Sequence, residues 1–342
     1  MILETACAPT FAAHQTFHPR FGWLKKGLDG VALNPGIFSE PSATLALGVG
    51  KNMVDAIRFW CSAFGLTTKI PAPGRGRGTH DVPTNIGAAF FSEQGFDPYM
   101  EDPTTLWVLH WRALSPVSAL PVWWLAFNRF SGREFSADDL VAFVQDELAG
   151  ASWASPNTSS LVKDVDCMVR MYASRATRGR QTVDDLIDSP FRELGVMSPA
   201  APGKYRFVVG DKPLLSSTAI AYASLDFMAS QLNGSMSCSF SKLLNDHSSP
   251  GKIMKLNEAT LAAALEEVAR ESAEISLASP GGSMQLVVHE EPVSVARRVL
   301  VAHYRARGLD MRRVPRVPVA GPGARAPLAQ LSLLDTEVQA AI

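Results

Sequence analysis

The sequence has few cysteines, and no two of them are closely spaced. The four cysteines among its 342 residues are Cys7, Cys61, Cys167 and Cys238. No Cys-x-x-Cys unit or other zinc-binding spacing is present. A chain of this length can bury enough apolar surface to fold without disulfides or structural metals. We therefore expect reduced thiols, as is usual in the cytoplasm.

Long apolar runs are also missing. No stretch reaches the roughly 18–20 residues that a membrane-spanning helix needs. The first residues, MILETACAPTFAAHQ, lack both a basic segment and a continuous apolar core, so they do not match a secretion signal. These absences predict a cytoplasmic protein with no membrane partner.

The sequence also has almost no net charge. Its formal charge is −1, and 46% hydrophobic with 19% charged residues is ordinary for a globular protein. The charges are unevenly placed, however. Residues 1–80 hold eight Lys or Arg against four acids, and residues 296–325 hold eight Arg against Asp310, whereas residues 258–291 hold seven Glu against one Arg. Basic ends around an acidic segment indicate a polyanion bound at particular patches.

Signatures of several enzyme classes are absent. The string GVGK at 48–51 lacks the outer glycine and the preceding strand of a P-loop, and Asn52 stands where a P-loop has Ser or Thr. No dinucleotide-binding fingerprint and no Ser-His-Asp order stands out. A helix that opens with Lys51 and Asn52 suits a DNA phosphate or a base edge better.

The N-terminal segment contains a predicted helix-turn-helix. Apolar spacing predicts helices at 18–33, 41–47 and 52–64, with Gly48 and Gly50 before the last one. One face of that last helix is apolar, formed by Met53, Ile57, Trp60, Cys61 and Phe64. In a helix-turn-helix the last helix enters the major groove. β-prone runs flank a loop with Arg75 and Arg77, as in a winged helix. The alternative is a plain helical bundle with a charged loop.

The predicted DNA-binding side chains gather around these helices and their loop. They are Arg20, Lys25, Lys26, Lys51, Asn52, Arg58, Arg75 and Arg77. The expected fold class is mainly α with short β hairpins. We divide the chain into a winged-helix-like domain at 1–95, an aromatic-rich helical core domain at 96–200, a mixed domain at 201–307 and a flexible basic tail at 308–342. The mixed domain is expected to contain a second winged-helix-like region, with Asn257 or Glu258 opening its long helix.

The densest acidic group beside the aromatic core consists of Asp97, Glu101 and Asp102, with His110 about two turns further on. A metal-dependent nuclease needs carboxylates that converge on Mg²⁺ or Mn²⁺. All three acids are therefore candidate catalytic residues, and Asp97 and Glu101 are candidate metal ligands. The alternative is that Asp102 only caps a helix. His14 is a further catalytic candidate, as a general base or a phosphate contact, although a lone histidine is more often structural.

Three long strings resemble one family: AHQTFHPRFGWLKKG at 13–27, LGVGKNMVDAIRFWCSAFGL at 47–66 and FDPYMEDPTTLWVLHW at 96–111. They are similar to the SspB-like proteins of bacterial DNA phosphorothioation clusters, long a family of unknown function. The resemblance implies a protein that nicks DNA so that sulfur can replace a phosphate oxygen. It implies three protein partners, namely a cysteine desulfurase, an ATPase and a sulfurtransferase-like enzyme. The matched positions are His14, Thr16, Arg20, Trp23, Lys25, Lys51, Asn52, Arg58, Asp97, Glu101, Asp102 and His110.

The leading hypothesis is a DNA-binding, divalent-metal-dependent nicking endonuclease of a phosphorothioate modification system that defends against phage. One alternative is a non-catalytic adaptor that recognises DNA for the sulfur-transfer enzymes. Another is a helix-turn-helix transcriptional regulator with an effector pocket among the tryptophans. Double-stranded DNA is the main expected partner, and a homodimer is among the expected assemblies.

Overall fold

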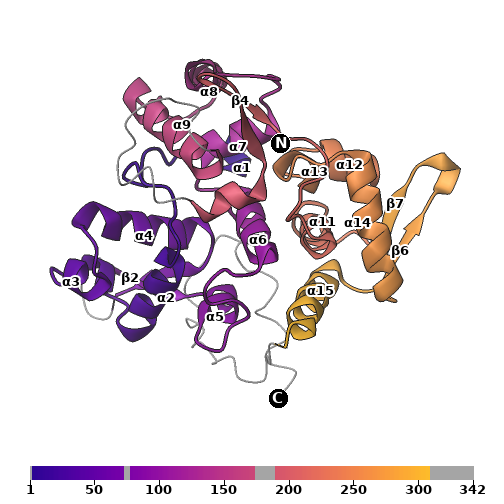
Figure 1. Ribbon diagram of the computed structural model, residues 1–342, viewed down its shortest axis with the longest axis horizontal. Coiled ribbons are helices and arrows are strands. Elements are labelled where there is room, and N and C mark those ends of the chain that lie inside the picture. Colours follow the sequence, from indigo (N-terminus) through magenta and orange to yellow (C-terminus); the bar gives the residue numbers. More distant parts are fainter. Residues whose placement is uncertain (1, 73–77, 174–188, 309–342) are drawn as a thin grey trace.

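The computed structural model describes residues 2–72, 78–173 and 189–308. Within these ranges the chain is mainly helical with short antiparallel strands (Figure 1), so the expected fold class is confirmed at this level. The strands are β1 (Thr67–Pro71), β2 (Thr79–Pro83), β3 (Met197–Ala201), β4 (Lys204–Phe207), β5 (Ser237–Ser239), β6 (Ile275–Ala278) and β7 (Gln285–Val288). No described helix is long and apolar enough to cross a bilayer.

The α-helices are α1 (Leu3–Ala6), α2 (Trp23–Leu33), α3 (Ala43–Leu47), α4 (Lys51–Ala63), α5 (Asn85–Phe91), α6 (Pro103–Leu114), α7 (Pro121–Asn128), α8 (Ala137–Ala149), α9 (Thr158–Tyr172), α11 (Ser217–Gln231), α12 (Phe240–Asn245), α13 (Pro250–Ile253), α14 (Glu258–Glu271) and α15 (Pro292–Ala306). Short 3-10 helices lie at η1 (Ile37–Ser39), η2 (Pro190–Leu194) and η3 (Pro280–Gly282). Gly308 is the one residue of the predicted tail at 308–342 that belongs to the described part.

Side-chain caps explain why several helices begin where they do. The Ser136 hydroxyl accepts from Asp139 N and the Asp139 carboxylate accepts from Ser136 N, which forms a capping box for α8. Asn157 and Asn257 cap α9 and α14 in the same manner. The predicted start of the first helix at residue 18 is wrong, because Gly22 has a φ of 75° and α2 begins only after it.

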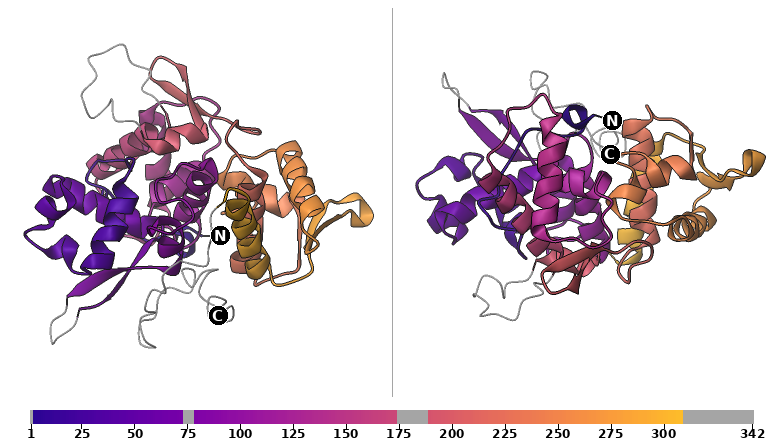
Figure 2. Two further views of the ribbon diagram at one scale, coloured as in Figure 1. Left: turned by 60° about the horizontal axis from the view of Figure 1, so that its bottom comes forward. Right: turned by 90° about the horizontal axis from the view of Figure 1, so that it is seen from above.

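The first unit of the fold consists of three helices followed by a hairpin. The helices α2, α3 and α4 precede the antiparallel pair β1–β2, whose register joins Thr67 to Pro83. Residues 73–77, between the two strands, lie outside the described residues. The hairpin projects from the body of the molecule (Figure 2). This order of elements is the one expected from the sequence.

The last unit follows a related order. Helix α11 leads to β5, then to α12, α13 and α14, and finally to the β6–β7 hairpin. The three strands form one antiparallel sheet in the order β5–β7–β6, so the last strand lies in the middle. Figures 1 and 2 show this hairpin and the β1–β2 hairpin at opposite ends of the molecule.

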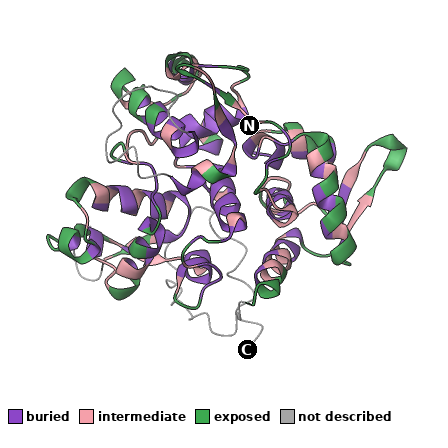
Figure 3. Cartoon of the chain, viewed as in Figure 1, coloured by how far each residue is buried: buried purple, intermediate pink, exposed green. Residues whose placement is uncertain are grey.

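The core lies between these two ends, where α6 and α7 are buried along most of their length (Figure 3). Its largest side chains include four tryptophans with at most 1% exposure, namely Trp107, Trp111, Trp123 and Trp124. Burying a large apolar side chain contributes on the order of 1.5–3 kcal/mol. The buried residues form one continuous cluster from Leu3 to Tyr304. The sequence-based division into four domains stays a prediction.

Two lysines lie in this core without a carboxylate partner among the described residues. Lys255 Nζ donates to Phe127 O at 2.6 Å and lies 4.3 Å from the centre of the Phe207 ring. Lys212 is 2% exposed, and its Nζ donates to Gly210 O and Lys255 O. Burial lowers the pKa of Lys255 to about 7 and that of Lys212 to about 8.

Lys255 should therefore make stability depend on pH. In the unfolded chain it stays protonated up to about pH 10, whereas in the folded protein it releases its proton near pH 7. The unfolded state binds more protons between these values, so the free energy of unfolding should rise with pH across this window. Urea denaturation at pH 7, 8.5 and 10 should show a flatter rise for Lys255→Met than for wild type. The exposed-site control Lys204→Met should follow wild type, and parallel profiles for all three proteins would contradict the assignment.

Candidate functional site

The exposed N-terminus of α4 is one candidate site. Lys51 and Asn52 open the helix and are both exposed, and Gly50 precedes them without a side-chain cap. The first main-chain N–H groups of a helix lack internal partners and carry its positive dipole end, so they attract anions. Lys26 on α2 is exposed as well. These three side chains are available to a phosphate backbone.

Other predicted DNA contacts are engaged inside the protein. Lys25 is 6% exposed, and its Nζ binds the carboxylates of Asp29 at 2.7 Å and Glu93 at 2.6 Å. Arg58 Nη2 lies 2.8 Å from the buried carboxylate of Asp81, which ties α4 to the β1–β2 hairpin. The positive charges of these two residues are largely compensated within the fold.

The remaining predicted DNA contacts differ from one another. Arg20 is 9% exposed and stacks over the rings of Phe17 and Trp23. Arg75 and Arg77 lie outside the described residues. Of the eight predicted side chains, the structure therefore leaves Lys26, Lys51 and Asn52 exposed.

Asp97 organises the turn that leads into α6. Its Oδ1 accepts from Glu101 N at 2.8 Å, and its Oδ2 accepts from Asp102 N at 2.9 Å and from Thr105 Oγ1 at 2.6 Å. The side chain is 6% exposed. Both carboxylate oxygens thus hold the local backbone, while Glu101 itself is exposed.

Asp102 combines a cap with a long-range contact. Its Oδ1 accepts from Thr104 N at 2.9 Å, so it caps α6 as the alternative interpretation expected. Its Oδ2 lies 2.7 Å from His303 Nε2 and 2.8 Å from Arg307 Nη1, both near the end of α15. Burial on its own raises the pKa of Asp102, but the hydrogen bonds from His303 and Thr104 N and the charge of Arg307 outweigh it and lower that pKa.

His303 lines a large pocket, and its other ring nitrogen contacts Thr218. Because Nε2 donates to the Asp102 carboxylate, Nδ1 carries the lone pair, and it lies 3.3 Å from Thr218 Oγ1. His303 and Arg307 line a pocket of about 930 Å³ between α11, α14 and α15. A histidine held in one tautomer by a carboxylate can take a proton from water or from a hydroxyl. His303 could not be predicted from the sequence, because no local pattern links residue 303 to residue 102.

His14 lies in the core. It is 1% exposed, and its Nε2 donates to Asp164 Oδ1 at 2.7 Å. Its ring stacks on Trp60 with the centroids 6.1 Å apart. Asp164 also accepts from Ala12 N. This geometry fits the structural alternative for His14, and its catalytic role stays a prediction.

His110 is also internal. Its Nε2 donates to Ile253 O at 2.9 Å, and its Nδ1 accepts from the Tyr172 hydroxyl at 2.8 Å. Burial lowers its pKa to about 4, so the ring is neutral at physiological pH. His110 therefore joins α6 to α9 and α13.

The described residues do not supply a set of protein ligands for the predicted Mg²⁺ or Mn²⁺. No group of three His, Cys, Asp or Glu side chains in residues 2–72, 78–173 and 189–308 is placed to hold a metal ion. The Asp97 carboxylate is occupied by the turn at Glu101 and Asp102.

Comparisons with known proteins agree with this architecture. The model of the family "Protein of unknown function (DUF4007)" matches residues 11–304. A solved structure described as "SspB crystal structure" is 36% identical, covers 92% of this chain and 93% of its own, and has a TM-score of 0.86. The chain belongs to the SspB family. A second SspB structure, described as magnesium ion-bound, is 35% identical, covers 92% of each chain and has a TM-score of 0.85.

The resemblance seen in the sequence is thereby confirmed, and it now covers the C-terminal half of the chain as well. No curated protein matches the chain. Since SspB is a phosphorothioation-system protein, this similarity associates the chain with such a system.

Proposed function

We propose that the protein is the DNA-nicking component of a phosphorothioation system. The observation that carries the proposal is the similarity to SspB over 92% of the chain, together with an exposed, uncapped helix start that presents Lys51 and Asn52. In this proposal α2, α3, α4 and the β1–β2 hairpin act as a winged helix, with α4 in the major groove. The loop that carries Arg75 and Arg77 would then be its wing.

The proposed cutting site is the pocket beside His303. Nδ1 takes a proton from a water molecule, and the resulting hydroxide forms a bond to phosphorus while one ester P–O bond breaks. The protonated ring then returns the proton to the leaving oxygen. Asp102 is a positioning residue that keeps Nε2 protonated, and the exposed Arg307 faces the phosphate charge.

In this proposal Mg²⁺ or Mn²⁺ would bind as a hydrated ion. Mg²⁺ usually keeps several waters and binds one or two carboxylates together with substrate phosphates. Glu101 is the exposed carboxylate of the predicted group and is the residue that would hold it. A Glu101→Gln variant would then need more Mg²⁺ to bind or cut DNA.

Incubation of the full chain with supercoiled plasmid and Mg²⁺ or Mn²⁺ tests the activity. Open circular DNA should accumulate before any linear product. Binding without nicks would instead support the second candidate, a non-catalytic adaptor for DNA. That candidate is favoured by Glu267, Glu271 and Glu274, which line the pocket beside His303 and repel a phosphate.

Lys51→Ala should weaken binding to duplex DNA and reduce its salt dependence. Each phosphate contact contributes about 0.9 to the slope of log affinity against log salt concentration, so losing one contact should lower the slope by about that amount. Fluorescence anisotropy at several salt concentrations measures both quantities. Lys163→Ala, at an exposed site on α9, is the matched control. Lys25→Ala should destabilise the fold without changing the slope, and an unchanged slope for Lys51→Ala would remove α4 from the interface.

A further inference from the structure

The C-terminal unit has the element order and strand order of a winged helix. Its order is α11, β5, α12 with α13, α14, β6 and β7, and its strands lie in the order β5–β7–β6. In this architecture the third helix and the final hairpin form the docking face. Those positions are occupied by α14 and by β6–β7.

This docking face is unsuited to DNA. Residues 258–291 hold seven Glu, one Arg and no Lys. Apart from Arg270, every exposed residue of α14 is either acidic or small. These residues are Glu258, Ala259, Ala263, Glu266, Glu267 and Glu271. Binding to DNA depends on cations that neutralise phosphates, and acids in this position repel them. A nucleic-acid reader would carry the opposite charge.

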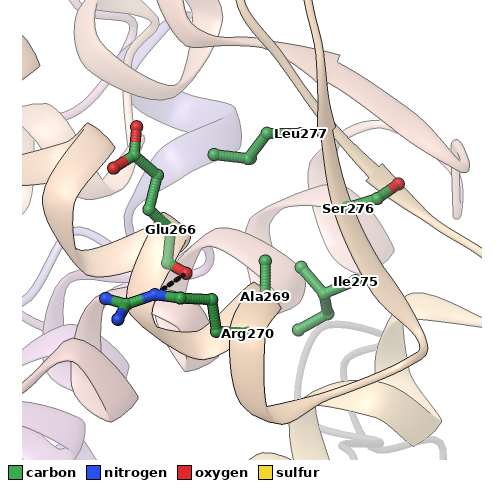
Figure 4. Close-up of a pocket in the computed structure, with 6 residues that line it drawn as sticks. All are labelled: Glu266, Ala269, Arg270, Ile275, Ser276 and Leu277. Carbon is green, nitrogen blue, oxygen red and sulfur yellow. Dashed lines mark hydrogen bonds between the residues drawn. The ribbon is translucent and has the colours of Figure 1, made fainter.

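A groove runs between α14 and β6 on this face. It has a volume of about 380 Å³ and is lined by Glu266, Ala269, Arg270, Ile275, Ser276 and Leu277. In Figure 4 the Glu266 and Arg270 side chains extend from the helix, and Ile275 and Leu277 lie on the strand beside it. The Arg270 guanidinium donates through Nε to Glu266 O at 3.2 Å, so it bonds to the main chain and leaves the carboxylate of Glu266 without a hydrogen-bond or ion-pair partner among the described residues.

We propose that this groove binds a basic segment of a partner protein, in which Lys or Arg residues flank an aliphatic side chain. The aliphatic group would lie on Ala269, Ile275 and Leu277, and the cations would face Glu266 and its acidic neighbours on α14. The two winged-helix-like units would then bind different partners. The unit at the α4 end would bind the DNA duplex, and the groove between α14 and β6 would bind a protein. This groove shares no lining residue with the pocket beside His303.

The probe is a 12-residue synthetic peptide in which Lys and Arg flank two leucines, with a control peptide that has Glu in place of every Lys and Arg. The full-length protein should bind the basic peptide and not the acidic one. Glu266→Lys should weaken binding about fivefold or more, because a rim charge is reversed. Leu277→Ala should weaken it as well, because the floor of the groove is lost. Glu134→Lys makes the same charge change at an exposed site away from α14 and should have little effect.

Equal weakening by Glu266→Lys and Glu134→Lys would overturn the proposal, since binding would then reflect net charge alone. No binding of the basic peptide would overturn it too. Amide hydrogen exchange should show protection of residues 275–288, which lie outside the lining of the pocket beside His303, by the peptide and not by duplex DNA. Protection of these residues by DNA would assign the groove to nucleic acid. A peptide of residues 309–325 can also be tested as a competitor. If it binds the groove more strongly than the synthetic probe, the occupant would be the chain's own arginines, and the proposal of a separate partner protein would be overturned.

Discussion

His303→Gln is expected to lower the rate of plasmid nicking by about 100-fold or more, because a positioned proton acceptor contributes about 10²–10⁴ to rate. Asp102→Asn should have a comparable effect, since the amide no longer fixes the tautomer of the ring. Asparagine caps helices as well as aspartate does, so α6 should remain intact in that variant. Nicking of supercoiled plasmid is followed by gel electrophoresis, and affinity for the same DNA is measured in parallel.

Two further measurements separate chemistry from structure. His289→Gln makes the same substitution at an exposed histidine of the C-terminal unit and should nick at the wild-type rate. The affinity of His303→Gln for the plasmid should equal that of wild type, because the substitution removes a proton acceptor and not a proposed DNA contact. Wild-type rates in both His303→Gln and Asp102→Asn would remove this pair from the reaction.

The second large effect concerns stability. Asp164→Ala should lower the free energy of unfolding by about 3–5 kcal/mol, because it leaves a buried polar partner unpaired. The His14 imidazole and Ala12 N both lose their acceptor in that variant. Urea denaturation measures the change, with the midpoint falling at constant slope.

Asp166→Ala is the matched control, two residues along α9 and exposed. It should change stability by less than about 0.5 kcal/mol, as surface substitutions usually do. If Asp164→Ala were as stable as Asp166→Ala, the pair would not be a structural element of the core. His14 would then regain its place as a catalytic candidate.

Local patterns in the sequence predicted local structure well. Asp102 was one predicted cap, and its side chain accepts from Thr104 N at the start of α6. Asn257 marks the start of α14 in the same manner. The apolar face of α4 was predicted from spacing, and Ile57, Trp60 and Cys61 are fully buried. Each of these signals comes from residues that lie within about two helical turns of one another in the sequence.

Contacts between distant residues could not be predicted in that way. Lys25 reads as an exposed cation on a helix, yet it binds Glu93, 68 residues away. Asp102 is recognisable as a cap, but the histidine bound to it lies 201 residues later. Such pairs depend on how the helices pack, and a single sequence has no periodic signal for them. The candidate site therefore emerged from the fold, whereas the family emerged from the sequence strings.

The contact between His303 on α15 and Asp102 at the start of α6 can form only late in synthesis, after residue 303 has been added. A ribosome adds about 5–20 residues per second, so the 201 residues between Asp102 and His303 take about 10–40 s to make at that speed. During that interval the helices proposed to bind DNA are already synthesised, while the proposed proton acceptor does not yet exist. In the proposed function, a chain that ends before residue 303 therefore lacks the group that would cut DNA.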